Sequence, residues 1–465
     1  MQSSSVGPAP RFLCRPQPSE CFVLPSVRLF DPSLGLDTVG DLVVAGGRIE
    51  AVGAGAPRPD EAEMLEAYRG CTVFPGFVDM HVHLRSPGQE YKEDVASAAR
   101  AAAAGGYVMV VGMANTAPPV DSGPLAAWVL EQAVLGADVL VGQVGAVSRG
   151  LRGEELAELR ELVDAGVAAF SDDGRPVVDS DLLLTALRYL RGTGRPVLLH
   201  LEDCSLSIGG SMHEGAWSAR LGIRGIPGAA ESGPLAQALE VLRHTCREAE
   251  ASATTPRGAG TPATPVHFQH LSAADSVRLV GRAKTEGLPV TAEVSPHHLL
   301  LTDERVRSFD QNLKINPPLR SAADRDALVA GLAEGIIDCV ATDHAPHAPH
   351  EKEVPFEDAP FGTVGLETAF AALYGGLVTE GPLLLGRLID ALSAAPCRCL
   401  GIEPPRLAVG AAARFCVVDL DEEWVVGPDD LAGKSRNSAF LGERVRGRVL
   451  LTVVEGTRRF VREGR

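Results

Sequence analysis

The sequence predicts an α/β protein built on a (β/α)8 TIM-like barrel, with a small β-sandwich domain formed by the N- and C-terminal segments. Two observations predict the barrel: eight short apolar runs follow one another through the middle of the chain, and helix-like segments separate them. A third observation concerns the two ends, which carry short strand-like pieces with glycine turns. An open, doubly wound parallel sheet also fits this alternation, so the pattern alone leaves it as an alternative.

The eight apolar runs are hydrophobic on both faces, which is typical of parallel strands covered by helices. They are Thr72–Met80, Tyr107–Met113, Val139–Val147, Val167–Phe170, Pro196–Leu199, Val266–Phe268, Pro289–Val294 and Ile336–Ala341. The helix-like segments between them include Lys92–Ala104, Gly153–Ala165, Ser180–Arg191, Pro234–Glu248, Ala273–Glu286 and Ala322–Glu334. Roughly 310 residues hold these units, which is enough for a barrel with insertions.

The predicted domains follow from this pattern. We expect residues 71–405 to form the barrel, residues 22–70 and 406–465 to pair into the small β-domain, and residues 1–21 to be a flexible tail. The segment Ala251–Pro265 is rich in Ala, Thr, Pro and Gly and has no periodicity, so we expect a flexible surface loop before the sixth strand.

Composition narrows the class of protein. A hydrophobic content of 45% in 465 residues is enough to bury a large core. The net charge of −17 argues against nucleic acid or an anionic membrane as a partner. Nine cysteines without a CxxC pair are typical of reduced thiols, and no signal peptide or apolar run of about 20 residues is found. We therefore expect a cytoplasmic enzyme or binding protein.

Histidines and aspartates follow five of the predicted strands. His81 and His83 lie two apart at the end of the first run, so both imidazoles point to the same face of a strand. The other candidates are Asp172 and Asp173 after the fourth run, His200 after the fifth, His270 after the sixth and Asp343 after the eighth. Because the carboxyl ends of barrel strands meet at one mouth, these donors suit one or two Zn²⁺ ions. A water bridging two such ions ionises near neutrality and can act as a nucleophile.

Two further residues point to a substrate that carries a carboxylate. Arg85 lies two residues beyond His83, so its planar guanidinium can enter the same mouth and bind a carboxylate through two hydrogen bonds. Asn115, which follows the second strand, can donate to the same group.

Longer motifs surround these residues: PGFVDMHVHLRSPG, KEDVASAARAAAAGGYVMVVGMANTAPP, LLHLED, FQHLS, EVSPHHL, NPPLR, ATDHAPH and FGTVGLETAF. In this combination the sequence resembles a type I dihydroorotase of the amidohydrolase superfamily, from about Asp41 to the C-terminus and leaving out Ala251–Pro265. The resemblance implies a zinc-dependent, reversible cyclisation of N-carbamoyl-L-aspartate to dihydroorotate in pyrimidine biosynthesis.

The resemblance also implies a role for each site residue. It gives His81 and His83 as the first metal pair, Asp173 as the bridging carboxylate, His200 and His270 as the second-metal ligands, and Asp343 as the last ligand and proton shuttle. It gives Arg85 and Asn115 as contacts to the substrate carboxylate, Asn316 and His347 as further substrate contacts, and Phe361 and Gly362 as backbone contacts to the ring. Spacing to His200 favours Asp173 over Asp172. Related hydantoinases, and some dihydroorotases, carry a carboxylated lysine at the bridge, whereas AAFSDDG has no lysine, so we expect no lysine carbamate.

Two other functions remain as alternatives. Another cyclic amidohydrolase, such as a hydantoinase or allantoinase, would use the same barrel, but Arg85 and the missing lysine argue against it. A non-catalytic scaffold for aspartate transcarbamoylase could lose its ligands, whereas this chain keeps all six candidate positions. We expect a homodimer and a small-molecule substrate, with aspartate transcarbamoylase as a candidate partner. The sequence leaves open whether one or two zinc ions bind.

Overall fold

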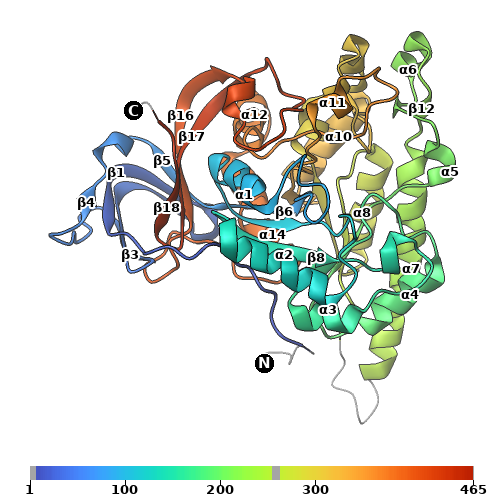
Figure 1. The fold of residues 1–465 in the computed structure, drawn as a ribbon, viewed down its shortest axis with the longest axis horizontal. Coiled ribbons are helices and arrows are strands. Elements are labelled where there is room, and N and C mark those ends of the chain that lie inside the picture. The colour runs from blue at the N-terminus through green and yellow to red at the C-terminus, as the bar shows by residue number, and fades with distance from the viewer. Residues whose placement is uncertain (1–6, 254–261, 464–465) are drawn as a thin grey trace.

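Eight parallel strands form a barrel in the computed structural model, which describes residues 7–253 and 262–463 (Figure 1). The barrel strands are β6 (Phe77–Val82), β7 (Tyr107–Gly112), β8 (Leu140–Gly145), β9 (Ala169–Phe170), β10 (Val197–Leu199), β13 (Val266–Phe268), β14 (Val290–Val294) and β15 (Cys339–Val340). They pair in sequence order from β6 to β15. A parallel bridge between Val82 and His344 joins the first strand to the residues after the last. The predicted (β/α)8 barrel is therefore confirmed, and the open doubly wound sheet is wrong.

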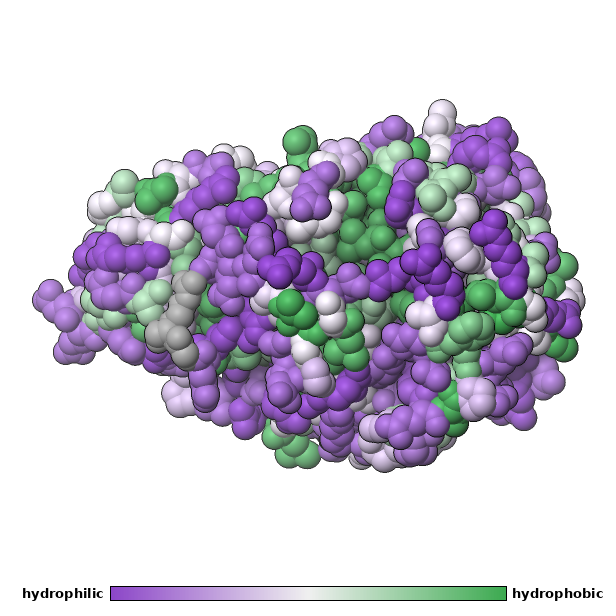
Figure 2. Space-filling model, turned by 90° about the horizontal axis from the view of Figure 1, so that it is seen from above, coloured by the Kyte–Doolittle hydropathy of each residue, from purple (hydrophilic) through white to green (hydrophobic). Residues whose placement is uncertain are grey.

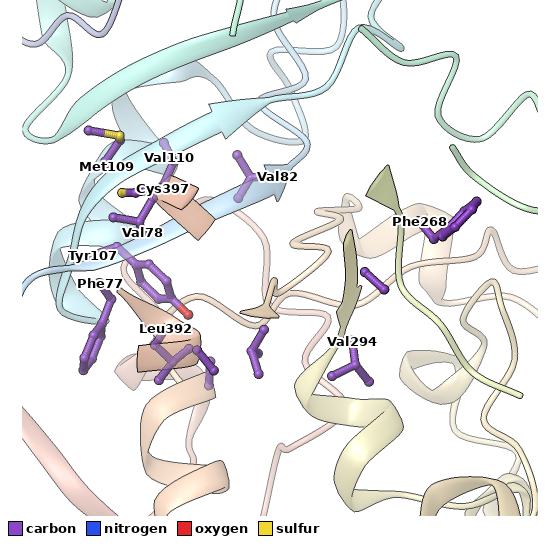
Figure 3. Close-up of a cluster of buried hydrophobic side chains, with 14 of the residues drawn as sticks. Phe77, Val78, Val82, Tyr107, Met109, Val110, Phe268, Val294, Leu392 and Cys397 are labelled. Atoms are coloured by element: carbon purple, nitrogen blue, oxygen red, sulfur yellow. The ribbon is translucent and has the colours of Figure 1, made fainter. Parts of the chain in front are cut away.

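Fourteen α-helices are described, most of them around the outside of this barrel. They are α1 (Val95–Ala104), α2 (Gly123–Gly136), α3 (Leu159–Ala165), α4 (Ser180–Tyr189), α5 (Cys204–Ser207), α6 (Ala216–Leu221), α7 (Ala229–Ala253), α8 (Ala274–Thr285), α9 (Pro296–Leu300), α10 (Ala322–Ala333), α11 (Pro349–Lys352), α12 (Ala369–Leu373), α13 (Leu385–Leu392) and α14 (Ala394–Leu400). Figure 3 shows part of the core, where Phe77 and Tyr107 on neighbouring strands lie near Leu392 of α13. The parallel strands are thus buried on both faces, as their apolar sequences require.

The inside of the barrel is filled by side chains. Met80, Val144, Leu198 and Cys339 come from four different strands and form one buried cluster. Cys399 of α14 packs against the same cluster, so the barrel is a closed core with its open end at the carboxyl mouth.

The first predicted strand run, Thr72–Met80, is divided in the structure. Residues Thr72–Pro75 form β5, which pairs with strands of the small sheet, and β6 begins only at Phe77. Gly76 separates the two strands, and a Cβ atom there would lie 2.2 Å from Cγ1 of Val108. The chain turns from one sheet into the other at this glycine because only a residue without a side chain fits so close to β7.

The two ends of the chain form one sheet of eight strands. Its members are β1 (Phe22–Asp31), β2 (Leu36–Ala45), β3 (Arg48–Gly53), β4 (Glu63–Met64), β5, β16 (Phe415–Val425), β17 (Arg444–Val454) and β18 (Thr457–Val461). Strand β5 lies at its centre between β1 and β16. Phe22 and Phe415 meet in its core with ring centroids 6.5 Å apart. The small β-domain predicted from the two ends is therefore present as a single continuous sheet.

The N-terminal segment differs from the flexible tail that the sequence suggested. Leu13 pairs with Val141 of β8, and the amide of Arg11 donates to the carbonyl oxygen of Gly166. Phe12 packs against the cluster inside the barrel. The apolar pair Phe12 and Leu13 explains this placement, because packing against the barrel partly shields two large side chains from water. Residues 1–6 and the middle of the predicted loop, 254–261, lie outside the described residues.

Helix α3 is shorter than the predicted segment Gly153–Ala165, because residues 148–158 form a turn that a bridge between Ser148 and Leu156 stabilises.

Hydrophilic side chains cover most of the face in Figure 2, and apolar side chains gather there only in small patches. Among the described helices, none combines the length and the apolar character that crossing a membrane requires.

Candidate metal centre and active site

The predicted donors meet at the carboxyl mouth of the barrel. His81 lies on β6, and His83 follows the same strand. Nε2 of His83 lies 3.0 Å from Oδ1 of Asp343, and Nε2 of His81 lies 3.5 Å from the same oxygen. His81 Nε2 is also 3.5 Å from Oδ1 of Asp173. The structure therefore brings together residues that are about 260 positions apart in the sequence.

Asp173 also faces the second pair of histidines. Its Oδ1 atom lies 3.4 Å from Nδ1 of His200 and 3.7 Å from Nε2 of His270. These two ring nitrogens are 2.9 Å apart, so both point toward one carboxylate oxygen. Asp173 is thus placed between the two histidine pairs, which is the position of a bridging carboxylate.

Asp172 has a different environment although it is the next residue to Asp173. Its Oδ1 accepts hydrogen bonds from the backbone amides of Val147 at 2.8 Å and Ser148 at 3.0 Å, and its Oδ2 accepts from the Ser148 hydroxyl. Asp172 therefore fixes the loop after β8, and Asp173 is the residue whose side chain lies among the histidines.

Two buried atoms in this cluster have no hydrogen-bond partner among the described residues: Nε2 of His81 and Oδ1 of Asp173. Buried polar atoms normally have a partner, because leaving one without costs about 1–3 kcal/mol. Donor atoms within 4.8 Å of one another form two groups here, His81–Asp173–His270 and His81–His83–Asp343. These residues can hold a metal ion, and an ion would provide the partner that both atoms lack.

The two carboxylates of the cluster are held in their ionised form. Burial alone would raise the pKa of Asp173, but His81 and the other histidines outweigh it and hold that pKa well below its ordinary value. In the same way, His81 and His83 overcome the effect of burial and lower the pKa of Asp343. Both carboxylates are therefore ionised at neutral pH and available as metal ligands.

A third group, His267, Glu293 and Cys339, lies inside the barrel below this cluster. Its polar atoms already have partners: Nδ1 of His267 contacts Thr291 Oγ1 at 2.7 Å, and its Nε2 contacts Oε2 of Glu293 at 3.2 Å. Oε1 of Glu293 lies 2.6 Å from Nδ1 of His81. This group is a hydrogen-bonded support that orients the His81 ring toward the mouth.

A cavity of about 220 Å³ opens above the donors. Ten of the residues that line it were predicted as site residues: His83, Arg85, Asn115, Asp173, His200, His270, Asn316, Asp343, Phe361 and Gly362. His81 is fully buried below the cavity. The volume is suitable for a small, polar molecule.

The backbone at the mouth is strained. Arg85, His270 and Asp343 have positive φ angles of 58°, 31° and 49°, which residues other than glycine rarely adopt. Each such conformation costs about 1–3 kcal/mol and persists only where the surroundings impose it. Strain at three predicted site residues supports a functional role for this mouth.

The two asparagines are both held by neighbouring groups. Asn115 donates from Nδ2 to Oδ2 of Asp173 at 3.1 Å, and its Oδ1 lies 3.0 Å from Nδ1 of His83. Asn316 donates to Oε2 of Glu202 at 3.0 Å. Asn115 therefore orients two candidate ligands as well as facing the cavity.

His347 does not line the cavity. Its Nε2 lies 2.8 Å from the carbonyl oxygen of Phe361. Burial and the nearby Arg85 guanidinium lower the pKa of His347 to about 3, so the ring is neutral and its Nε2–H can donate to that carbonyl. His347 thus supports the loop that carries Phe361 and Gly362.

Sequence reasoning missed Glu202 and Glu293. Oε2 of Glu202 lies 3.1 Å from Nε2 of His200, and His200 outweighs burial to lower the pKa of Glu202 to about 2. Glu202 lies two residues beyond His200. Arg85 has the same spacing from His83 and was predicted as a site residue for that reason, so this spacing could also have identified Glu202. Glu293 lies within a strand, and no sequence signal separates it from an ordinary strand residue.

Comparison with known proteins agrees with this geometry. The model of the amidohydrolase family matches residues 72–459. The dihydroorotase of Citrifermentans bemidjiense is 44% identical over 429 residues, which cover 92% of this chain and 97% of that protein. The dihydroorotase of Anaeromyxobacter sp. (strain K) is 46% identical over 440 residues, covering 94% and 97%.

Among solved structures, the L-hydantoinase (dihydropyrimidinase) from Arthrobacter aurescens superposes with a TM-score of 0.81 at 24% identity, covering 95% of this chain and 96% of that one. A second, the dihydropyrimidinase from Brevibacillus agri, gives a TM-score of 0.77 at 21% identity. At these identities the likeness shows the fold alone. The family match and the curated relatives together place the chain: it belongs to the amidohydrolase family and, within it, to the dihydroorotases.

Proposed function

We propose that this protein catalyses the reversible cyclisation of N-carbamoyl-L-aspartate to dihydroorotate and water. The observation that carries the proposal is the joint lining of one cavity by Asp173, Asp343 and Arg85, with His83, His200 and His270 around the two carboxylates. Such a cavity combines a metal-binding side with a cationic side, as a small cyclic amide with a free carboxylate requires.

The metal side would hold two Zn²⁺ ions, with His81, His83, Asp173, His200, His270 and Asp343 as ligands. Imidazole and carboxylate donors suit zinc, and Asp173 faces both histidine pairs as a shared ligand would. When bound, zinc supplies polarisation of the amide carbonyl and a water of lowered pKa. No lysine carbamate is needed, because Asp173 occupies the bridging position.

The other side of the cavity would hold the substrate. Arg85 suits the free carboxylate because its guanidinium is planar and presents paired N–H donors. Asn115 and Asn316 also line the cavity, and Phe361 and Gly362 would offer backbone groups to the ring. His347 supports this side through the carbonyl of Phe361.

Asp343 would move the proton. In ring opening, its carboxylate accepts a proton from the attacking water and delivers it to the departing ring nitrogen. In ring closure, it removes a proton from the ureido nitrogen. Its Oδ1 atom lies 3.0 Å from Nε2 of His83, so this carboxylate and the histidine face the same proposed metal position.

The direct test is hydrolysis of dihydroorotate, hydantoin and allantoin by the purified protein, with and without chelator. Turnover of dihydroorotate alone, lost with chelator and restored by zinc, supports the proposal. Preference for hydantoin or allantoin would assign the chain a different cyclic amide. Closure turns two carboxylates into one and consumes a proton, so the ratio of cyclic to open product should rise about tenfold for each unit fall in pH. A ratio independent of pH would exclude this reaction.

The proposal extends to the state of the enzyme in the cell. We place it in the cytoplasm as a homodimer, with aspartate transcarbamoylase as a candidate partner. Light scattering of the protein alone and mixed with that enzyme tests both assemblies. A protein that binds no zinc and has no turnover, alone or in the mixture, would instead be a scaffold.

A further inference from the structure

A segment of the C-terminal part of the chain contacts several loops at the mouth of the barrel. This segment, residues 432–439, connects β16 to β17. The amide nitrogens of Ala432 and Gly433 donate to Oε1 of Glu367, at 2.9 and 3.2 Å, and the hydroxyl of Ser435 donates to the carbonyl oxygen of Lys92 at 2.8 Å. The segment is therefore attached both to the loop after β6 and to the residues before α12.

Asn437 is the most highly bonded residue of this segment. Its Oδ1 accepts from the backbone amide of His347 at 3.0 Å. Its Nδ2 donates to the carbonyl oxygens of Ala345 at 3.0 Å and Gly362 at 3.2 Å. Its own carbonyl oxygen accepts from the amide of Val364 at 3.0 Å. One buried amide side chain thus joins the loop after β15 to the loop that contains Gly362.

The contact between these two loops is close. Gly362 has a φ angle of 135°, and a Cβ atom there would lie 2.8 Å from Cβ of Ala345 and 3.0 Å from Nε2 of His347. Two backbone segments can pack this closely only if the position of each loop relative to the other is fixed. The hydrogen-bonding capacity of Asn437 matches this need, because one amide group can accept from one loop and donate to both.

The contacts of Asn437 lie on one side of the cavity. The two loops carry Ala345, Phe361 and Gly362, which line the cavity, together with His347. Within the described part of the chain, residues 432–439 make no hydrogen bond with the six candidate metal ligands. The segment therefore contacts the proposed substrate side, and it makes no direct hydrogen bond to the proposed metal ligands within the described residues.

We propose that Asn437 is a positioning residue, which holds the loops 345–347 and 361–364 in the arrangement that binds the substrate ring. This inference rests on the proposed function for the identity of the substrate. It assigns to the C-terminal segment a part in substrate binding that is independent of metal binding.

Asn437→Ala tests the proposal by separating KM from kcat. We expect KM for dihydroorotate and for carbamoyl-aspartate to rise about tenfold or more, because the variant loses the three side-chain hydrogen bonds that hold the two binding loops. The change in kcat should be smaller, and the zinc content per chain should equal that of the unmodified protein. Amide hydrogen exchange in residues 345–364 should become faster. Asn437→Asp keeps the oxygen that accepts from the His347 amide but loses the donations to Ala345 and Gly362. Its KM should therefore lie between that of the unmodified protein and that of Asn437→Ala.

Thr452→Val is the matched control. The Thr452 hydroxyl donates to the carbonyl oxygen of Ala103 at 2.6 Å, in a buried contact between β17 and the end of α1 away from the mouth. Its loss should lower stability while KM and exchange in residues 345–364 stay unchanged. If Asn437→Ala does not fold, Thr363→Val is a less disruptive substitute. It removes the hydrogen bond that the Thr363 hydroxyl donates to the Asn437 carbonyl oxygen at 3.0 Å, and it should raise KM in the same direction.

The proposal is overturned if the variants at Asn437 lose stability as Thr452→Val does, with KM within twofold of the original and exchange in residues 345–364 unchanged. Loss of zinc in Asn437→Ala would also overturn it, since the metal side would then depend on this segment. If the unmodified protein does not hydrolyse dihydroorotate, the proposed function fails, and the exchange measurement still decides whether Asn437 holds the loops.

Discussion

Replacing Glu293 with Gln should weaken zinc binding without changing the shape of the site. Glu293 is 1% exposed, and its Oε1 lies 2.6 Å from Nδ1 of His81, so the carboxylate fixes the ring that directs Nε2 toward the mouth. A hydrogen bond to a charged group contributes about 1.5–3 kcal/mol. With tenfold in affinity for each 1.4 kcal/mol, the loss corresponds to a zinc dissociation constant raised about 10- to 100-fold.

The measurement is a competition titration of zinc against a chromophoric chelator, with the cobalt(II) absorption spectrum as a second readout of ligand geometry. Glu367→Gln is the matched control, because Glu367 is also a buried glutamate but its Oε1 accepts only from backbone amides of residues 432 and 433. It should bind zinc as tightly as the unmodified protein. Unchanged zinc affinity and an unchanged cobalt spectrum in Glu293→Gln would refute the reasoning, and would remove His81 from the proposed ligands.

Three further predictions follow from other parts of the structure. Asp343→Asn should reduce kcat for dihydroorotate by orders of magnitude while part of the zinc stays bound; full activity by steady-state assay would exclude the proton transfer proposed for it. Gly362→Ala should raise KM and lower stability, because the new Cβ would lie 2.8 Å from that of Ala345 at a φ of 135°; unchanged kinetics would show that the loop relaxes freely. Burial lowers the pKa of Lys352 to about 7, whereas in the unfolded chain the ordinary value is about 10.4, so the unfolded state binds more protons between pH 7 and pH 10. The free energy of unfolding should therefore rise with pH across that window, by up to about 5 kcal/mol. Urea unfolding of Lys352→Met should show a weaker dependence on pH than the unmodified protein. Parallel pH curves for the two proteins would contradict this.

The sequence was a good guide where one physical rule controls the outcome. Apolar runs alternating with helical segments predict a barrel, and the carboxyl ends of its strands meet at one mouth. This is why His81, His200 and His270 could be expected to lie together although they are far apart in the chain. In the structure, ring nitrogens of His200 and His270 are 2.9 Å apart.

Other features depend on the local path of the backbone, which residue patterns do not reveal. Asp172 and Asp173 are chemically identical neighbours, and only the turn after β9 decides which one points into the cavity. Glu293 and Asn437 act through contacts with residues 212 and 90 positions away, so nothing near them in the sequence marks their role. The sequence predicts that Phe12 belongs to a flexible N-terminal segment, because its contact with the barrel depends on residues far away in the chain.

The sheet built from both chain ends has a consequence for synthesis of the protein. Phe74 of β5 pairs with Cys416 of β16, about 340 residues later in the chain. At a ribosomal rate of about 5–20 residues per second, β5 waits roughly 20–70 s for this neighbour. During that time one edge of β5 is unpaired and open to association with other nascent chains. The yield of folded protein should therefore depend on how well this edge is protected until the last strands emerge.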